Sequence, residues 1–426
     1  MAEKIIRDPV HDVIAFRLEK PVDALLFRLI NANEFQRLRR IRQLGMASLA
    51  YPGADHSRYS HSLGVMETAR KMLQQLGQSF EIDEKEATVC LAAALLHDLG
   101  HGPFSHIFEH LSGVGHETVT LQIIQDPQSE VHQLLIAHDR QLPTLISDLL
   151  HSKPKRTFFC DMISSQLDAD RFDYLLRDNL HTGSRYGDFD LTWVLHALTI
   201  DQTGNRLAVT WKGVSAVEGY LQSRYHMYRN VYFHKVVRAA EGMMKLAMQR
   251  AERLAVQDRL TWPPRDDAVH KALLGQQLSN DEFTDLDDVS IQQCLKQWAR
   301  GDDPILARLC NGLLYRRLYK TIDLSAIADN ENALKIVELA RQAVSAAGGD
   351  PAYDLFYDEP ADTPYEIYDG RSADADIWVE NAHGQLTRFA EISPLTRALG
   401  QQLMFRRLHV LSEYRDTVER VLPKLK

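Results

Sequence analysis

Metal-ligand side chains cluster around residue 97 of this 426-residue chain. His97 and Asp98 directly follow eight apolar residues, Val89–Leu96, and the imidazoles of His101 and His106 come within the Gly-Pro turn after them. A buried polar group without a partner costs ~1–3 kcal/mol. A bound cation is the simplest partner for an adjacent imidazole and carboxylate, so this run predicts a metal site.

Further ligand types lie on both sides of the run. His61 stands at the start of one expected helix, and Asp168 and Asp170 stand at the start of another. Imidazoles and carboxylates together suit a divalent transition metal, which lowers the pKa of a bound water toward neutrality. The spacing does not choose between the two aspartates, and it does not distinguish Mn, Fe, Mg, Zn, Ni and Co. Taken singly, each histidine is equally an ordinary, partly buried side chain.

The elements that must position these side chains are mainly helices. Residues 4–17 alternate apolar and polar residues and predict short strands, whereas residues 84–98 are apolar on most faces and predict a central buried helix. Apolar residues spaced by three and four predict further helices over 22–44 (with a break near 31–33), 59–76, 104–111, 116–125, 131–137, 142–151 and 169–181.

The second half of the chain mixes helical and strand patterns. Helical patterns cover 214–256, 268–347 and 394–421. Strand patterns cover 206–211, 353–357, 377–380 and 388–392. The fold class is therefore mainly α, with small β elements and an α+β C-terminal part. We expect a core over 1–255, whose motif region is 50–180, and a C-terminal lobe over 256–426.

Composition limits the classes of function. The net charge of −9 gives no broad cationic surface, which does not favour binding to nucleic acid or acidic membranes. No apolar run approaches the ~20 residues of a membrane helix, and residues 1–4 lead into no signal-peptide pattern. The chain has four cysteines and no CxxC pair, which fits a reducing cytoplasm.

Three sequence strings together carry a family resemblance. They are Arg-Tyr-Ser-His-Ser-Leu-Gly at 58–64, His-Asp-Leu-Gly-His-Gly-Pro-Phe-Ser-His at 97–106 and Asp-Ala-Asp-Arg-Phe-Asp-Tyr at 168–174. The chain resembles the HD-domain phosphohydrolases, and within them the deoxynucleoside triphosphate (dNTP) triphosphohydrolases. The resemblance implies an HD-domain helical core in which water attacks the α-phosphorus of a dNTP, dGTP included, to release deoxynucleoside and triphosphate. The metal ligands that it implies are His61, His97, Asp98 and Asp170.

The same resemblance implies the groups around the phosphates and the sugar. A dyad of His116 and Glu109 would perform acid–base work, His101 would contact a phosphate, and His106 would protonate the leaving oxygen. The alternative is that these are pairs on a helix surface. Phe233 stands where a human member of this family, to which the chain is also similar, has glutamine, which leaves the base preference open. The implied substrate contacts are Gln43, Leu44, Arg58, Arg171, Tyr174, Asp178, Arg224, Tyr232 and His234.

Regulation by a nucleotide is also implied by the resemblance. It places an activating nucleotide between the subunits of a homo-oligomer, a dimer or a tetramer. Asn31 stands where the human relative has an aspartate, and Trp193 stands near an expected arginine, so a solvated basic helix face is the alternative. The allosteric positions would be Lys4, Gln36, Arg39, Lys235 and Arg316.

The leading hypothesis is thus a metal-dependent dNTP triphosphohydrolase of the cytoplasm. An HD-type phosphohydrolase or phosphodiesterase acting on another nucleotide is a second hypothesis, because the metal ligands are common to both. A nucleotide-sensing module with a vestigial site is a third, although the complete ligand set argues against it.

Overall fold

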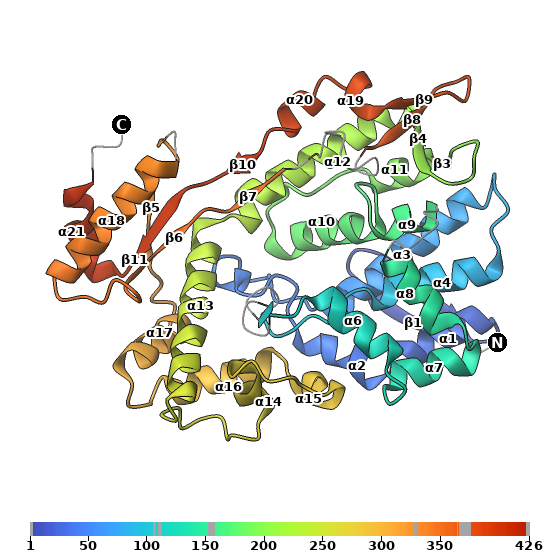
Figure 1. Ribbon diagram of the computed structural model, residues 1–426. Coiled ribbons are helices and arrows are strands. Elements are labelled where there is room, and N and C mark those ends of the chain that lie inside the picture. The colour runs from blue at the N-terminus through green and yellow to red at the C-terminus, as the bar shows by residue number, and fades with distance from the viewer. Residues whose placement is uncertain are drawn as a thin grey trace.

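The computed structural model describes residues 3–104, 108–109, 113–151, 158–327, 330–363, 365 and 376–422 (Figure 1). Over these residues the fold is mainly α with four small sheets, which confirms the expected fold class. No helix among the described residues is long and apolar enough to cross a membrane. The predicted residue His106 and most of the predicted helix over 104–111 lie outside the described residues.

The N-terminal half is a bundle of helices around α4, preceded by an antiparallel hairpin of β1 (Glu3–Asp8) and β2 (Asp12–Arg17). Residues 88–96 of α4 are all buried, because the helix packs against both α3 and α8. The helices of this half are α1 (Pro21–Leu29), α2 (Asn33–Arg37), α3 (Arg58–Leu76), α4 (Glu84–Leu96), α6 (His116–Gln125), α7 (Glu130–His138), α8 (Leu142–Leu150), α9 (Phe158–Ile163) and α10 (Ala169–Thr182).

The second half contains the long helix α13, which packs against α14, α17, β5 and β6 (Figure 1). Its helices are α11 (Leu191–Ala197), α12 (Val214–Met227), α13 (Lys235–Val256), α14 (Ala268–Leu273), α15 (Asn280–Asp285), α16 (Asp288–Trp298), α17 (Pro304–Leu314), α18 (Asn330–Ala346), α19 (Phe389–Ile392), α20 (Thr396–Leu399) and α21 (Arg415–Val421). Its strands are β3 (Leu198–Ile200), β4 (Leu207–Thr210), β5 (Lys320–Asp323), β6 (Leu355–Asp358), β7 (Ala361–Asp362), β8 (Trp378–Glu380), β9 (Leu386–Arg388), β10 (Leu403–Met404) and β11 (Arg407–Val410).

The small sheets join segments that are distant in sequence. One sheet has the order β3-β4-β8-β9 with β4 and β8 parallel, and a second, antiparallel sheet has the order β5-β11-β6. The second sheet forms a core of its own with α18 and α21, whereas the main core contains residues from Ile14 to Leu399. The strands β7 and β10 pair with each other and lie between these two sheets (Figure 1).

Several expected elements of the C-terminal part are wrong. Residues 389–392 form the short helix α19 and not a strand, because the pairing of β9 with β8 ends at Arg388. The helix expected over 394–421 is instead α20, β10, β11 and α21, because Gly400 ends α20 and all four residues of β11 are buried as the central strand of a sheet.

Two expected helical stretches are interrupted. A single turn of π-helix (Tyr228–Tyr232) separates α12 from α13, whose N-cap is His234. The edge strand β5 interrupts the stretch over 268–347 because it pairs with β11, a segment more than 80 residues later in the chain. Such pairings lie beyond what local periodicity can predict.

Candidate metal centre and active-site cavity

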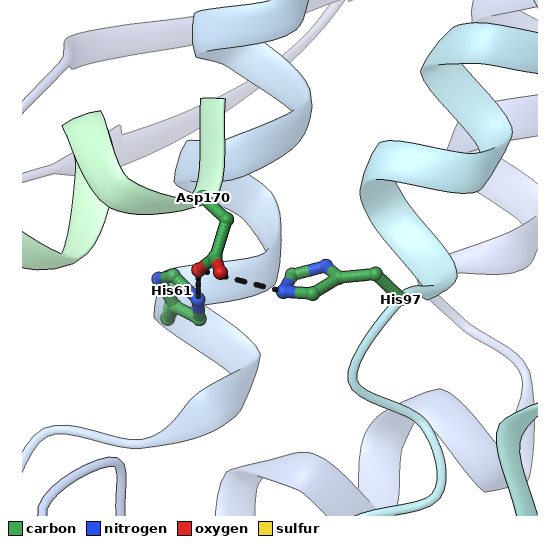
Figure 2. A group of neighbouring side chains, drawn as sticks. All are labelled: His61, His97 and Asp170. Atoms are coloured by element: carbon green, nitrogen blue, oxygen red, sulfur yellow. Dashed lines mark ion pairs between the residues drawn. The ribbon is translucent and has the colours of Figure 1, made fainter. Parts of the chain in front are cut away.

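Three helix ends bring metal-ligand side chains together. His61 lies in the first turn of α3, His97 follows the last turn of α4, and Asp170 lies in the first turn of α10, and the three point toward one another (Figure 2). Asp170 Oδ1 is 3.0 Å from His61 Nε2 and 3.8 Å from His97 Nε2. The three ligand atoms lie within 4.8 Å of one another, so the group could hold one metal ion.

Asp98, the fourth predicted ligand, lies beside these three and also belongs to a second possible metal group with His101 and His116. Its Oδ1 lies 3.3 Å from His97 Nε2, and its Oδ2 lies 3.8 Å from His61 Nε2. The same Oδ2 accepts a hydrogen bond of 2.5 Å from the Arg58 guanidinium. Burial alone raises the pKa of Asp98, but Arg58 and the neighbouring imidazoles hold it well below its ordinary value. The carboxylate is therefore charged and available to a cation.

The two aspartates that the spacing left open have different environments. Asp168 is the N-cap of α10: its Oδ1 accepts from the amide of Arg171 at 2.7 Å, and its Oδ2 pairs with the Arg171 guanidinium. Asp168 is fully buried in this arrangement. Asp170 instead faces His61 and His97, which favours Asp170 as the ligand.

Each histidine is oriented through the ring nitrogen that faces away from the centre. His97 Nδ1 lies 2.9 Å from the carbonyl oxygen of Ala94, and His61 Nδ1 lies 2.8 Å from Asp173 Oδ2. Such contacts fix Nδ1 as the protonated nitrogen and leave the Nε2 lone pair for a metal. His97 Nε2 is buried and makes no hydrogen bond among the described residues. The donor set and this orphaned atom both fit a divalent ion.

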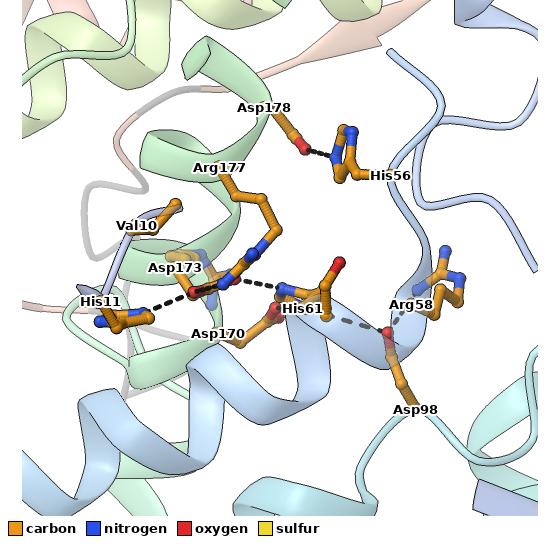
Figure 3. A network of polar contacts seen from close by, with 12 residues as sticks. Val10, His11, His56, Arg58, His61, Asp98, Asp170, Asp173, Arg177 and Asp178 are labelled. Atoms are coloured by element: carbon orange, nitrogen blue, oxygen red, sulfur yellow. Dashed lines mark hydrogen bonds and ion pairs between the residues drawn. The ribbon is translucent and has the colours of Figure 1, made fainter. Parts of the chain in front are cut away.

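Sequence reasoning missed Asp173, which holds His61 in place. Asp173 is fully buried and contacts His61, His11 and Arg177 at 2.8 Å each, and Arg177 also pairs with Asp8 at 2.8 Å (Figure 3). The spacing of four between Asp173 and Arg177 on α10 was a visible signal. The contacts with the β1–β2 hairpin were not visible, because they join segments more than 160 residues apart.

A second cluster of titratable side chains lies next to the candidate metal centre. His101 Nε2 lies 3.2 Å from Asp98 Oδ1, the rings of His101 and His116 stack with centroids 3.8 Å apart, and His116 Nδ1 lies 2.5 Å from Glu109 Oε1. Burial and the Arg58 charge lower the pKa of His101 to about 3. Burial also lowers the pKa of His116, but Glu109 and Asp98 overcome this effect and raise it above its ordinary value. The two imidazoles are thus driven toward opposite protonation states.

A cavity of about 670 Å³ opens beside these groups. Arg58, which pairs with Asp98, is part of its wall. On the opposite side the wall continues along α13 to β6. The predicted substrate residues in the wall are Gln43, Leu44, Arg58, Tyr174, Asp178 and Tyr232.

Asp178 is held rigidly at this cavity. Its Oδ1 lies 2.7 Å from His56 Nε2, and its Oδ2 accepts from the Tyr232 hydroxyl at 2.8 Å. His56, which was not predicted, is buried and stacks on the ring of His181 at 4.4 Å. Tyr232 ends the π-helical turn, whose extra residue directs this side chain toward α10.

The remaining predicted substrate residues are not part of the cavity wall. The Arg171 guanidinium is engaged by Asp168 and by the carbonyl of Ser165, and His234 caps α13. Arg224 is buried, yet its Nε and Nη1 make no hydrogen bond among the described residues. A buried guanidinium with orphaned donors is suited to an anion.

The predicted allosteric residues lie on several elements. Gln36 and Arg39 contact each other, with Arg39 Nε 2.9 Å from Gln36 Oε1, and the Arg39 guanidinium lies 3.6 Å from the centre of the Tyr59 ring. Arg316 Nε donates to the carbonyl of Leu49 at 2.7 Å. Lys4 lies on β1 and Lys235 begins α13.

Known proteins are similar to this chain in sequence and in fold. A family model described as HD domain matches residues 58–154, and one described as HD associated region matches residues 189–261. The protein YwfO of Bacillus subtilis is 37% identical over 369 residues, which cover 86% of this chain and 82% of YwfO. A solved phosphohydrolase of Bacteroides thetaiotaomicron has a TM-score of 0.82 and 30% identity, and the match covers 96% of this chain and 100% of that one. The chain is an HD-domain phosphohydrolase.

A more distant relative of this HD protein has a specific name. A protein of Dictyostelium discoideum named deoxynucleoside triphosphate triphosphohydrolase SAMHD1 homolog is 29% identical over 372 residues. The match covers 82% of this HD protein and 65% of that relative. HD domains bind divalent metal ions, which agrees with the donor set around His61.

Proposed function

We propose that this HD protein hydrolyses dNTPs, dGTP included, to deoxynucleoside and triphosphate, with water attacking the α-phosphorus. The observation that carries the proposal is that one cavity joins the phosphate end and the sugar end of such a substrate. Arg58 connects the cavity to the candidate metal centre, and Tyr174 and Asp178 lie in the same wall. The name of the Dictyostelium relative supports the same substrate class.

The chain supplies cationic groups for the triphosphate. Arg58 lines the cavity and is fixed by Asp98, so its guanidinium can receive a phosphate oxygen there without reorganisation. Arg224 has buried donors without partners among the described residues but lies outside the cavity wall, so a local rearrangement is needed before it can contact a phosphate. A divalent ion held by His61, His97, Asp98 and Asp170 would polarise a phosphoryl oxygen and lower the pKa of a nearby water.

Acid–base work falls to the imidazoles beside Asp98. His116, whose pKa Glu109 raises although burial opposes this, can keep a proton near neutral pH and can serve with Glu109 as an acid–base dyad. His101 stays neutral and can donate one hydrogen bond to a phosphate oxygen. The role of His106 as the leaving-group acid remains a proposal based on its position in the motif.

Recognition of the deoxyribose is proposed for Asp178 and Tyr174. Asp178, held by His56 and Tyr232, presents a fixed carboxylate that can accept from a 3′-hydroxyl. Tyr174 lies one helical turn before Asp178 on α10, where its ring can contact the sugar face and oppose a 2′-hydroxyl.

A substrate panel tests the proposal. The protein is incubated with Mn²⁺ and each dNTP, each ribonucleoside triphosphate or a cyclic dinucleotide, and also with dGTP after chelation with EDTA. We expect turnover of dNTPs, at least about tenfold slower turnover of ribonucleotides and none without metal. Preference for the cyclic dinucleotide would favour the alternative phosphodiesterase, and no turnover with any metal would favour a vestigial site.

The variant His97→Ala is the matched test of the metal centre in this panel. Because His97 contributes an orphaned Nε2, its loss should abolish both metal binding and dNTP turnover. His138→Ala, which changes a histidine at the end of α7, should keep both. A fully active His97→Ala variant would contradict the proposed centre.

We also propose that a guanine nucleotide assembles the protein into a homo-oligomer through Lys4, Gln36, Arg39, Lys235 and Arg316. The contact between Gln36 and Arg39 supports a shared site for these two residues. Size-exclusion chromatography with light scattering, with and without dGTP, tests this proposal. An increase in mass with dGTP is expected, and an unchanged mass together with undiminished activity would contradict it.

A further inference from the structure

A buried carboxylate from outside both matched family regions contacts the walls of the cavity. Asp288 is the first residue of α16 and is only 3% exposed. Its Oδ1 accepts from the backbone amide of Phe104 at 2.8 Å, and its Oδ2 accepts from the backbone amide of Arg42 at 3.0 Å. Both carboxylate oxygens are therefore used to hold main chain.

The two amides belong to different loops of the cavity. Arg42 directly precedes Gln43 and Leu44, which line the cavity, and Phe104 lines it as well. Phe104 comes three residues after His101 and has a φ of +50°, a backbone conformation that a bulky side chain rarely adopts. The hydrogen bond to Asp288 therefore holds this loop in a conformation that its sequence does not favour.

A second contact joins the same three segments. The guanidinium of Arg37 is buried and donates through Nε to the carbonyl of Leu286 at 2.7 Å and through Nη1 to the carbonyl of His101 at 2.9 Å. The turn that begins α16 is thus tied both to the segment before Gln43 and to the segment around His101. Among the described residues, the two hydrogen bonds of Asp288 go to the amides of Phe104 and Arg42 and not to a candidate metal ligand.

We infer that Asp288 is a positioning residue for hydrolysis, holding the Gln43 loop and the His101–Phe104 loop at a fixed separation across the cavity. This inference rests on the proposed function for its substrate. Burial raises the pKa of Asp288 above its ordinary value, although the hydrogen bonds from the amides of Phe104 and Arg42 oppose this effect. Because the carboxylate touches neither substrate nor metal, its effect on turnover passes through the two amides.

The test compares Asp288→Ala, Asp288→Asn and Asp287→Ala. An asparagine keeps one acceptor oxygen and an alanine keeps none, so kcat/KM for dGTP should fall about tenfold and about a hundredfold respectively. Asp287 is the matched control: it caps α16 through Val289 and Ser290 and pairs with the side chain of Arg40, but it holds neither amide. Asp287→Ala should lower Tm while keeping kcat/KM within about twofold.

Three further readouts separate positioning from general destabilisation. Hydrogen exchange in peptides 41–44 and 99–104 should accelerate in Asp288→Ala but not in Asp287→Ala. Binding of Mn²⁺, measured by calorimetry, should stay unchanged in both variants. KM for dGTP should rise because the Gln43 loop lies at the proposed sugar end of the cavity. The value of kcat should fall because the other loop contains His101.

The outcomes distinguish this inference from the proposed function. Unchanged turnover in Asp288→Ala, or lower turnover with unchanged exchange in both peptides, would overturn the inference. All activity assays are repeated with bis(4-nitrophenyl) phosphate. If the unaltered protein cleaves only this ester, the proposed dNTP substrate is wrong and the same comparison on the ester decides the inference. If the unaltered protein cleaves neither compound, both the proposed function and the inference about Asp288 are wrong.

Discussion

His101 and His116 are stacked on each other and yet are driven to opposite protonation states. His101 is buried beside Arg58, which lowers its pKa to about 3, whereas His116 lies against Glu109, which raises its pKa although burial opposes this. A pair of groups whose environments separate their pKa values indicates a division of acid and base roles. We therefore assign the transferable proton to His116 and not to His101.

Changing Glu109 to glutamine tests this assignment. Without the carboxylate the pKa of His116 falls, so the protonated imidazole is lost at a lower pH. The alkaline limb of the kcat/KM profile for dGTP should then move to lower pH, and activity should fall about 10²-fold at pH 8 but less at pH 6. Glu117→Gln, which changes an exposed carboxylate in the first turn of α6, is the control and should leave the profile unmoved. If kcat/KM in the Glu109→Gln variant falls by the same factor at every pH, the assignment of the proton to His116 is contradicted.

The candidate ligands His61 and Asp170 are placed by the contact between helices α3 and α10. Gly64 lies one turn after His61, and a Cβ atom at this position would come within 1.9 Å of Asp173 Oδ1 and 2.3 Å of Arg177 Nη2. Only glycine lets the buried pair of Asp173 and Arg177 lie directly against α3. The same close approach places Asp173 within reach of His61.

Alanine at Gly64 should therefore destabilise the protein and weaken metal binding. Overpacking against a buried ion pair should lower the free energy of unfolding by about 3 kcal/mol or more. Gly219→Ala is the control, because a Cβ at this glycine within α12 meets nothing within 4 Å and should add about 0.5–1 kcal/mol. Urea unfolding and Mn²⁺ titration measure both effects. Equal stabilities of the two variants would argue against the close packing of α3 and α10.

The sheet β5-β11-β6 is attached to α13 by a charged contact. Asp358 at the end of β6 receives two hydrogen bonds from the Arg238 guanidinium, of 3.1 and 2.5 Å. Burial raises the pKa of Asp358, but His409 and Arg238 lower it more strongly, to about 2. A depressed pKa stabilises the folded state at every pH above the unfolded value and loses this effect as pH falls through the folded value.

The variant Asp358→Asn should reveal this contribution through its pH dependence. The shift from 3.8 to about 2 corresponds to about 2 kcal/mol at pH 7 and about 1 kcal/mol at pH 3. The difference in the free energy of unfolding between the native protein and the variant, measured in urea, should shrink accordingly between pH 4 and pH 2. A difference that stays constant over this range would show that Asp358 does not act through its charge.

The sequence allowed the helices near the centre to be predicted better than the contacts between them. His61, His97, Asp98 and Asp170 stand in contiguous motifs, and the helix ends that carry them follow from local patterns and caps such as Asp168. Asp288 had no such signal, because its partner Phe104 lies 184 positions away in the chain. The same reason explains the missed strands β5 and β11, whose pairing is tertiary.

At the scale of the whole molecule, the cavity is assembled from segments far apart in the chain. Its wall contains Gln43, Phe104 and Tyr174 from the N-terminal half, Lys245 from α13 and Tyr357 from the C-terminal sheet. The two family models match residues 58–154 and 189–261 only. The parts of the chain outside these matches therefore shape the cavity, and we expect them to determine which nucleotide it accepts.

The most direct test of the central claim is the identity of the products formed from dGTP in ¹⁸O-labelled water with Mn²⁺. Water attack on the α-phosphorus predicts deoxyguanosine and intact triphosphate in equal amounts, with the label found only in triphosphate. Deoxyguanosine monophosphate with pyrophosphate, or label in the deoxyguanosine, would contradict the account.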